Sequence, residues 1–196
     1  MVPRLIDHKA RELEVAEAAW RVLQRDGIKK LSVRTVAAEA GLATASLRRA
    51  FPTQGSLFAY SLECVQQRVH ERIEIAAPGA TLRETVETAL LQLLPLDDER
   101  RLEMEVFLVI GSMALSDPGL RPAYENANEA MAAGCGNVIG LLIQAGQARP
   151  GLHPGTEAQK LHALIDGLAL HLLRKGPKEP TAWAVDVLRS HLDSLR

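Results

Sequence analysis

Arginine and hydroxyl side chains gather in one short stretch of this chain. Arg48 and Arg49 can donate hydrogen bonds to phosphate oxygens, and an arginine can also bind the edge of a guanine through two donors. Thr44 and Ser46 add hydroxyl groups on either side of Ala45. If these five side chains project from one short helix, they can enter the major groove of double-stranded DNA. The stretch therefore predicts a DNA-binding surface.

The residues around this stretch are spaced as in a helix-turn-helix. Ala37 is small where two helices would cross closely, and Gly41 supplies the positive φ that turns the chain between them. Five apolar side chains are expected to face inward and to hold the second helix at a fixed angle: Val36, Ala40, Leu42, Leu47 and Ala50. An ordinary helical hairpin in an all-α core is the alternative. The preceding helix, the outward arginines and the proline that follows favour DNA binding.

A preceding helix is expected to complete a DNA-binding head over residues 1–52. It begins with Asp7 as N-cap, carries one apolar face, runs to about Arg25 and ends at Gly27. Three basic residues at its start can reach phosphates or an adjacent minor groove, although such residues are more often only solvated: Arg4, Lys9 and Arg11. The head is therefore expected to hold three helices.

Two helix starts in or beside the head can also bind phosphate. Ser32 is the natural N-cap of one helix, and after Pro52 another helix begins with Thr53 as its N-cap. Backbone N–H groups at a helix start are unpaired and attract anions. The expected phosphate contacts are Ser32, Thr35, Thr53 and Gln54.

The composition favours an all-α protein of about nine helices. Of the 196 residues, 47% are apolar, and they recur at helical spacing without runs of alternating β-branched residues. Residues 1–60 hold ten Lys or Arg against six Asp or Glu, and the rest hold thirteen against eighteen. A basic head on an acidic body suits DNA, because phosphate is neutralised locally. Chance unevenness also produces a difference of this size.

Cysteine usage and hydropathy predict a soluble protein of the cytoplasm. Cys64 and Cys135 lie far apart without metal-ligand spacing, so neither a disulfide framework nor a metal site is expected. The N-terminus lacks an apolar signal core, and the longest apolar run, from Val106 to Leu115, is too short to span a bilayer. No membrane partner is expected.

Residues 53–196 are expected to form a helical domain for ligand binding and dimerisation. Helical spacing predicts segments from Gln54 past Arg72, from Thr81 to about Pro95, from Leu102 to Leu115, from about Leu120 to Gln147, from Glu157 to Lys175 and from Thr181 to Leu195. The segment from Leu102 is apolar nearly all round, which predicts a central helix. The next one contains Gly134, Gly136, Gly140 and Gly146, which predicts close packing, a kink or a looser wall.

The last two helices carry apolar residues on more than one side. On the final helix one stripe comprises Ala184, Val187, Leu188, Leu192 and Leu195. Trp183 and Val185 lie off this stripe and add apolar surface. We expect a homodimer through a four-helix interface of these two helices. The alternative is that both sides pack within one subunit.

The body is also expected to bind a small-molecule effector of unknown identity. The candidate lining residues combine apolar side chains with a few polar tips: Met104, Phe107, Gly111, Tyr124, Asn128, Met131 and Asp166. Core packing is the alternative role for each of them. Aromatic residues are scarce, so no cage for a quaternary ammonium is evident. Glu103 or Glu105 would favour a cationic ligand if it pointed inward; otherwise both end in solvent or pair with Arg100 or Arg101.

Two other classes of function compete with this interpretation. His162 and Asp166 share a helix face with His171 nearby, but no third ligand or nucleophile accompanies them at helical spacing. We therefore expect no catalytic residues, no metal and no cofactor. The other alternative is a helical dimer that acts through protein partners without tight DNA binding.

The chain resembles the TetR family of bacterial transcriptional regulators. Residues 15–27, 31–42 and 46–57 are similar to the family's first helix, its second helix with the turn, and its recognition helix running into the fourth. The body resembles the BetI-type regulatory domain through Phe107, the turn at 117–120 and residues 165–170. The resemblance implies a homodimer that reads a palindromic operator, usually as a repressor, until a ligand changes the spacing of its heads. One helical turn separates half-sites by ~34–36 Å.

Three residues depart from the family pattern where it touches DNA. Ala45 stands where a glycine is common, Arg48 where a tyrosine contacts phosphate, and Gln54 where a lysine contacts phosphate. Arg48 can itself reach a phosphate. The departures leave the base preference unreadable and keep the alternative without tight DNA binding open.

Overall fold

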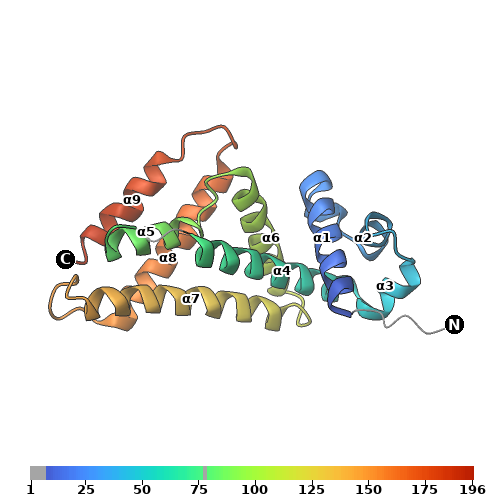
Figure 1. The fold of residues 1–196 in the computed structure, drawn as a ribbon, viewed down its shortest axis with the longest axis horizontal. Helices are drawn as coiled ribbons and strands as arrows, with labels where there is room; N and C mark the ends of the chain where they lie inside the picture. The colour runs from blue at the N-terminus through green and yellow to red at the C-terminus, as the bar shows by residue number, and fades with distance from the viewer. Residues whose placement is uncertain (1–7, 77–78) are drawn as a thin grey trace.

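The computed structural model describes residues 8–76 and 79–196, with side chains from Arg11 onward in the first helix. Within these ranges it contains nine α-helices, one short 3-10 helix and no strand, which confirms the expected all-α class. Asp7, Arg4 and the side chain of Lys9 lie outside the described residues. Figure 1 shows an elongated molecule with α1 to α3 at one end, α5 to α9 at the other, and α4 reaching between them.

The head consists of α1 (His8–Asp26), η1 (Ile28–Lys30), α2 (Val33–Glu39) and α3 (Thr44–Ala50). Gly27 and Gly41 adopt φ of 73° and 66°, a region that side chains rarely enter, so each turns the chain as expected. Ala37 is fully buried where α2 meets its neighbours. The inward face is confirmed except at Ala50, which is exposed. Ala50 is the last residue of α3, beyond the reach of the head's core.

Reciprocal caps begin three of the helices. Ser32 accepts a hydrogen bond from the Thr35 amide, and the Thr35 hydroxyl accepts one from the Ser32 amide. Thr53 and Ser56 make the same pair of bonds at the start of α4 (Gln54–Ile75). Thr81 does so with a glutamate at the start of α5 (Leu82–Leu91). Each capping box satisfies two backbone N–H groups at the start of its helix, and the three boxes confirm the expected N-caps.

The body is completed by α6 (Asp98–Ala114), α7 (Arg121–Gln144), α8 (Pro154–Arg174) and α9 (Ala182–Asp193). The expected start of α6 at Leu102 is wrong, because Asp97 caps a helix that already includes the charged residues before Leu102. The helix is also less central than expected: Val109 is partly exposed, and Leu115, just after its end, is 80% exposed. The expected α7 runs about three residues too long, since it ends at Gln144.

Two apolar clusters form the core. The first joins α1, α2 and α3 to α4, α6 and parts of α7 and α8, so apolar packing continues across residues 52 and 53. The second joins α5, α7, α8 and α9. The division of the chain at residue 52 stays a prediction, but the shared core shows that α4 is packed to the head and to the body alike.

The glycines of α7 do not serve close packing within the subunit. A Cβ atom on Gly134, Gly136 or Gly140 would meet no heavy atom within 4 Å. Gly146 lies just after the helix, with φ of 66°. A kink and a looser wall both stay predictions for α7. None of the described helices is long and apolar enough to cross a membrane.

Candidate DNA-binding head and ligand cavity

The outer face of α3 presents the cationic side chains that the sequence indicated. Arg48, Arg49 and Ala45 are exposed, and Thr44 is half-exposed. Among the described residues, neither arginine takes part in an ion pair. Within the described part of the chain, both guanidinium groups therefore keep their donors free.

Ser46 is already engaged by the first helix. Its hydroxyl accepts a hydrogen bond of 2.7 Å from Nη2 of Arg11, 35 residues earlier in the chain. The structure thus places Arg11 beside the outer face of α3. Sequence reasoning treated Arg11 as one of several basic residues near the N-terminus, and spacing alone offered no signal for this contact.

The expected phosphate contacts at the helix starts have intramolecular partners. The Thr35 hydroxyl donates to the carbonyl oxygen of Lys30 at 2.8 Å, in addition to its part in the cap with Ser32. Gln54 donates from Nε2 to the carbonyl oxygen of Leu31 at 2.5 Å. Gln54 therefore ties the start of α4 to the segment between η1 and α2. Phosphate binding by Ser32, Thr35, Thr53 and Gln54 stays a prediction.

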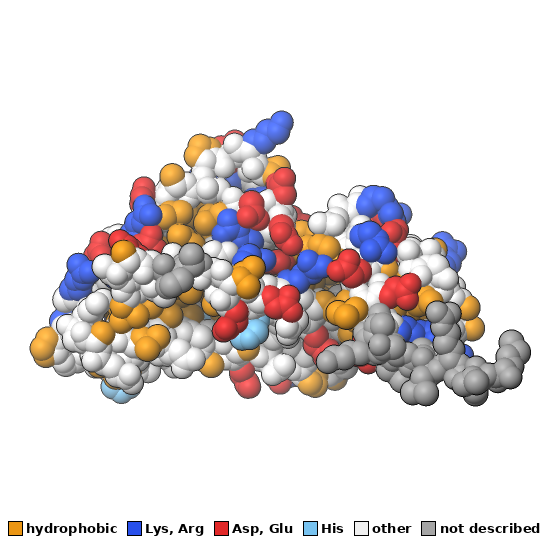
Figure 2. All heavy atoms as spheres, in the orientation of Figure 1, with side chains coloured by type: hydrophobic (Ala, Val, Ile, Leu, Met, Phe, Trp, Pro, Cys, Tyr) orange, Lys and Arg blue, Asp and Glu red, His pale blue; other side chains and the backbone are white. Residues whose placement is uncertain are grey.

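Ion pairing separates the basic residues of the head into two groups. Arg21 and Arg25 both bind Glu39, at 2.8 and 2.7 Å. The hydrogen bonds from Arg25 and Arg21 lower the pKa of the Glu39 carboxyl. Five exposed cations have no ion pair among the described residues: Lys29, Lys30, Arg34, Arg48 and Arg49. Blue side chains are visible over the head in Figure 2.

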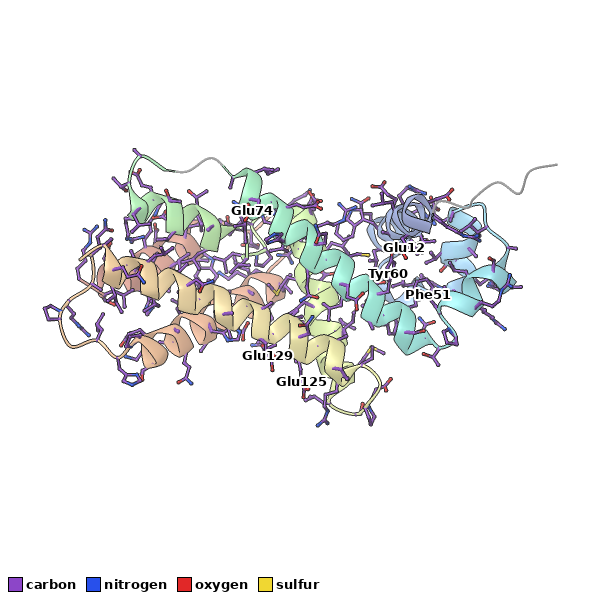
Figure 3. All side chains as sticks on the ribbon, turned by 60° about the horizontal axis from the view of Figure 1, so that its bottom comes forward. Glu12, Phe51, Tyr60, Glu74, Glu125 and Glu129 are labelled. Atoms are coloured by element: carbon purple, nitrogen blue, oxygen red, sulfur yellow. The ribbon has the colours of Figure 1, made fainter. Side chains whose placement is uncertain are left out.

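Aromatic contacts tie α4 to the head. The rings of Phe51 and Tyr60 lie 5.0 Å apart, and the Tyr60 hydroxyl donates to the carbonyl oxygen of Glu12 at 2.8 Å (Figure 3). The guanidinium of Arg68 lies 4.4 Å from the ring centroid of Trp20 on α1. Burial raises the pKa of Tyr60 above its ordinary value, so the hydroxyl stays protonated and keeps donating. A displacement of α4 therefore acts directly on α1.

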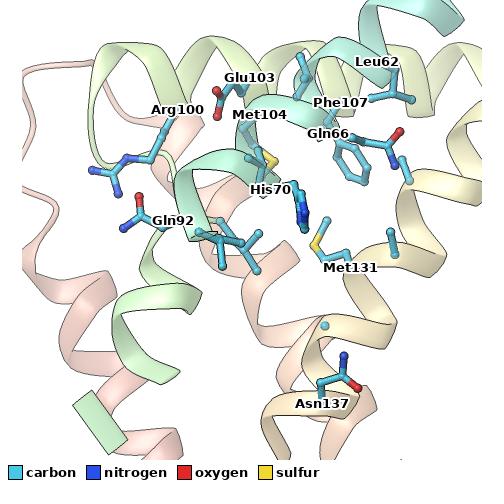
Figure 4. A pocket seen from close by; sticks show the side chains of 17 residues that line it. Leu62, Gln66, His70, Gln92, Arg100, Glu103, Met104, Phe107, Met131 and Asn137 are labelled. Carbon is cyan, nitrogen blue, oxygen red and sulfur yellow. The ribbon is translucent and has the colours of Figure 1, made fainter. Parts of the chain in front are cut away.

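A cavity of about 380 Å³ lies between α4, α6, α7 and the segment after α5. Figure 4 shows its lining side chains. The apolar part includes Leu62, Val65, Val69, Ile73, Met104, Phe107 and Met131. The polar part comprises Gln66, His70, Gln92, Arg100, Glu103 and Asn137. Because His70, Gly134 and Asn137 are exposed, the cavity opens to solvent between α4 and α7.

Three of the seven expected ligand residues line this cavity, namely Met104, Phe107 and Met131. The other four do not line it: Gly111, Tyr124, Asn128 and Asp166. Gly111 and Tyr124 instead pack against each other, since a Cβ atom on Gly111 would lie 2.5 Å from Cε2 of Tyr124. The ring of Tyr124 in turn lies 5.3 Å from that of Phe107 and supports the cavity wall from behind.

Helical spacing found three of the lining residues on α6 and α7 and none on α4. Gln66, His70 and Ile73 lie one turn apart on α4, on the face that meets α6 and α7. The sequence shows this spacing, but it does not show which neighbours the face meets. The wall formed by α4 therefore became visible only in the fold.

Glu103 lines the cavity, which was one of the two alternatives for this residue, but its partner is neither Arg100 nor Arg101. It is 4% exposed and binds Arg72 on α4, whereas Glu105 is exposed. Arg100 pairs with Asp97 instead, and Arg101 donates to carbonyl oxygens at the end of α8. Arg72 lies 31 residues before Glu103 and was outside the range of local pairing rules.

His162 and Asp166 lie together on one face of α8. Nε2 of His162 lies 3.6 Å from Oδ2 of Asp166. No group of three or more potential ligands that could hold a metal occurs among the described residues. Burial raises the pKa of Asp166, and His162 partly opposes this effect.

The two C-terminal helices bury one side within the subunit and leave another open. Ala184, Leu188, Leu192 and Leu195 are buried in the second cluster, and Trp183 packs against it. Val187, which was expected on the same apolar stripe, is 41% exposed in the single subunit. Leu170 on α8 is similarly exposed, at 39%. Part of the apolar surface thus packs internally, and part remains available to a partner.

Comparison with known proteins defines the class. Residues 15–60 match the family model of bacterial regulatory proteins of the tetR family. Residues 82–196 match the model of the C-terminal domain of the BetI-type transcriptional repressor. The chain belongs to the TetR family of transcriptional regulators.

Relatives of known sequence or structure cover nearly the whole chain. The HTH-type transcriptional regulator PksA of Bacillus subtilis (strain 168) is 32% identical over 195 residues, which are 99% of this chain and 94% of PksA. A transcriptional regulator from Rhodococcus sp. Rha1 is similar with a TM-score of 0.76 and 26% identity, covering 94% of this chain and 95% of that one. The multidrug binding protein EbrR complexed with ethidium is similar with a TM-score of 0.64 and 29% identity, covering 92% of this chain and 98% of that one.

Proposed function

We propose that this regulator is a cytoplasmic, homodimeric repressor that leaves a palindromic DNA operator when a small molecule binds its body. The observation that carries the proposal is the pair Arg48 and Arg49 on the second helix of a helix-turn-helix, both exposed and without an ion pair to any residue that the structure describes. Arginine donors in that position suit phosphate oxygens or the edge of a guanine. The head is proposed to comprise residues 1–52 and the body 53–196.

The fold supports a ligand-controlled head. Helix α4 forms one wall of the cavity through Gln66 and His70 and contacts α1 through Tyr60. A ligand that favours one position of α4 therefore favours one position of the head. We propose this cavity as the effector site. The relative EbrR binds ethidium, which supports a small-molecule ligand for this chain without identifying it.

The dimer is proposed to form through α8 and α9. Leu170 and Val187 leave apolar side chains exposed on these two helices. A two-fold contact of the pair with its copy would bury them in a four-helix interface. Such a dimer sets the distance between two heads and thereby the spacing of the two half-sites.

The decisive experiment titrates the purified protein against its own upstream intergenic DNA and against a scrambled sequence, at low and at higher salt. Tight binding to the first DNA alone is the expected result, because groove contacts add to phosphate contacts. Equal, weak binding to both that vanishes with salt would leave only an electrostatic attraction and would overturn the proposal.

A second candidate is a TetR-like dimer that acts through protein partners without tight DNA binding. The observation that favours it is Gln54, whose side chain is bonded to Leu31 at the place where the family commonly has a phosphate-contacting lysine. This candidate would be supported if the protein did not bind its upstream DNA and if removal of Arg48 and Arg49 had no consequence.

A further inference from the structure

One ion pair involves a residue that lines the proposed ligand cavity. Glu103 is the one carboxylate among the described residues that line the cavity, and it is 4% exposed. Both of its oxygens accept from Arg72, at 2.8 Å from Nη1 and 2.5 Å from Nη2. Arg72 also donates to the carbonyl oxygen of Gln92. The hydrogen bond with Glu103 raises the pKa of Arg72, so the guanidinium keeps its charge.

The other cation at the cavity is neutralised in the same way. Arg100 binds Asp97 through Nε and Nη2, both at 2.9 Å. Its Nη1 donates to the carbonyl oxygen of Leu91, also at 2.9 Å. Arginine and carboxylate charges therefore cancel at this end of the cavity. A charged ligand would meet no unpaired arginine or carboxylate to offset the loss of its hydration.

The cavity also lacks the aromatic surface that binds cations. Phe107 is the single aromatic ring among its described lining residues apart from the imidazole of His70. Where the protein offers no free carboxylate, a bound cation needs several aromatic ring faces around it to gain a comparable attraction. Quaternary or aromatic cations would therefore lose more in desolvation than they gain inside.

Neutral hydrogen-bonding groups remain free in the lining. Gln66 and Asn137 make no side-chain hydrogen bond within the described part of the chain. Both residues line the cavity, Gln66 from α4 and Asn137 from α7 (Figure 4). Each can donate to or accept from an uncharged polar group. The described lining also holds His70, Gln92 and the ion-paired Arg100 and Glu103, and its other residues are apolar or glycine.

We propose that the cavity takes a neutral, mostly apolar small molecule with one hydrogen-bonding group, and that Arg72 determines this specificity by occupying Glu103. The inference rests on the proposed role of the cavity as the effector site. Removing Arg72 would expose a buried carboxylate, so the same cavity would then attract cations. Arg72 thus works as a specificity-determining residue without lining the cavity itself.

The test uses two fluorescent probes of nearly the same shape, acridine and N-methylacridinium. Acridine is neutral at mildly alkaline pH, whereas the methylated form carries a permanent positive charge. Fluorescence titration of the full chain without DNA is expected to show acridine bound at least about tenfold more tightly than N-methylacridinium. Equal or tighter binding of the cation to the unaltered chain would overturn the proposal.

Variants at the ion pair make the test specific. Arg72→Gln is expected to raise the affinity for N-methylacridinium at least about tenfold, and the double variant Arg72→Gln with Glu103→Gln is expected to abolish that gain. Arg68→Gln, one turn away on α4 and outside the cavity lining, is the matched control and should leave both affinities unchanged. If Arg72→Gln does not fold, the double variant still tests the proposal, because it is expected to bind acridine more tightly than N-methylacridinium. A folded Arg72→Gln without the gain for the cation would refute the role of Arg72.

A pair of glycine variants establishes where the probe binds. Gly134 lines the cavity and Gly136 does not, while a Cβ atom at either position meets no atom within 4 Å. Gly134→Leu should weaken acridine binding at least about tenfold, and Gly136→Leu should not. Absence of acridine binding, or equal binding to both variants, counts against the inferred ligand class. Because no DNA is present, these outcomes are separate from failure of the operator titration, which would count against the proposed function.

Discussion

The Tyr60 hydroxyl on α4 donates a hydrogen bond of 2.8 Å to the backbone carbonyl oxygen of Glu12 on α1. The two residues lie 48 positions apart, and the bond links the helix that walls the cavity to the first helix of the head. The ring of Tyr60 also packs on Phe51, which directly follows α3. A single side chain thus connects α4 to both ends of the head.

Tyr60→Phe should weaken the coupling between ligand and DNA. The substitution keeps the ring contact with Phe51 and removes one hydrogen bond, so the expected loss of unfolding free energy is about 1 kcal/mol. Operator release should require more ligand, because α4 moves the head less directly. Tyr124→Phe is the matched control, since the Tyr124 hydroxyl makes no hydrogen bond within the described residues. Equal effects of both variants on release would contradict a special role for Tyr60.

Arg49→Ala should reduce operator affinity by ~1–3 kcal/mol, with a smaller loss on scrambled DNA, because a guanidinium that reads a guanine distinguishes sequences. Binding isotherms on both DNAs at fixed salt provide the measurement. Arg174→Ala, at an exposed site on α8, should leave both affinities unchanged. A loss of the same size on every DNA would instead make Arg49 a phosphate contact.

Gly111→Ala should destabilise the folded protein by ~1–3 kcal/mol, because the added methyl group would lie 2.5 Å from Cε2 of Tyr124 and force the ring away. The midpoint of urea denaturation is the measurement. Gly140→Ala in α7 is the comparison. Its added methyl group would meet no heavy atom within 4 Å, and the substitution removes a glycine from the interior of a helix. That variant should be neutral or more stable by up to ~1 kcal/mol. A tolerated Gly111→Ala would show that the Tyr124 ring can move freely.

Cys135 should make stability fall at alkaline pH. Burial, with a smaller effect of Asp166, raises the pKa of its thiol from 9.0 to about 11. The folded state therefore favours the protonated thiol, and the resulting stability is complete below pH 9.0 and is lost as the pH rises to about 11. Melting temperatures across this window should fall less steeply for Cys135→Ala than for the unaltered chain. If the thiol had the same pKa in the folded and the unfolded state, the plots of melting temperature against pH for the two proteins would differ only by a constant offset.

Short-range patterns determined much of the fold from the sequence alone. Ser32, Thr53 and Thr81 each begin a helix because the partner of the cap lies three residues further on. Gly27 and Gly41 turn the chain because a positive φ is a property of one residue. The recognition helix with Arg48 and Arg49 follows from the same local spacing. Such features depend on neighbours within one or two turns, so sequence spacing is sufficient to locate them.

The tertiary structure alone decided which distant side chains meet. Arg11 reaches Ser46, Gln54 reaches Leu31 and Arg72 reaches Glu103, over separations of 35, 23 and 31 residues. Each of these polar groups had several possible partners of suitable chemistry. The placement of α1 beside α3 selected the first pair, and the orientation of α4 selected the other two. Local spacing identifies the face of a helix, but only the packing of whole helices brings two faces together and satisfies the polar groups that become buried.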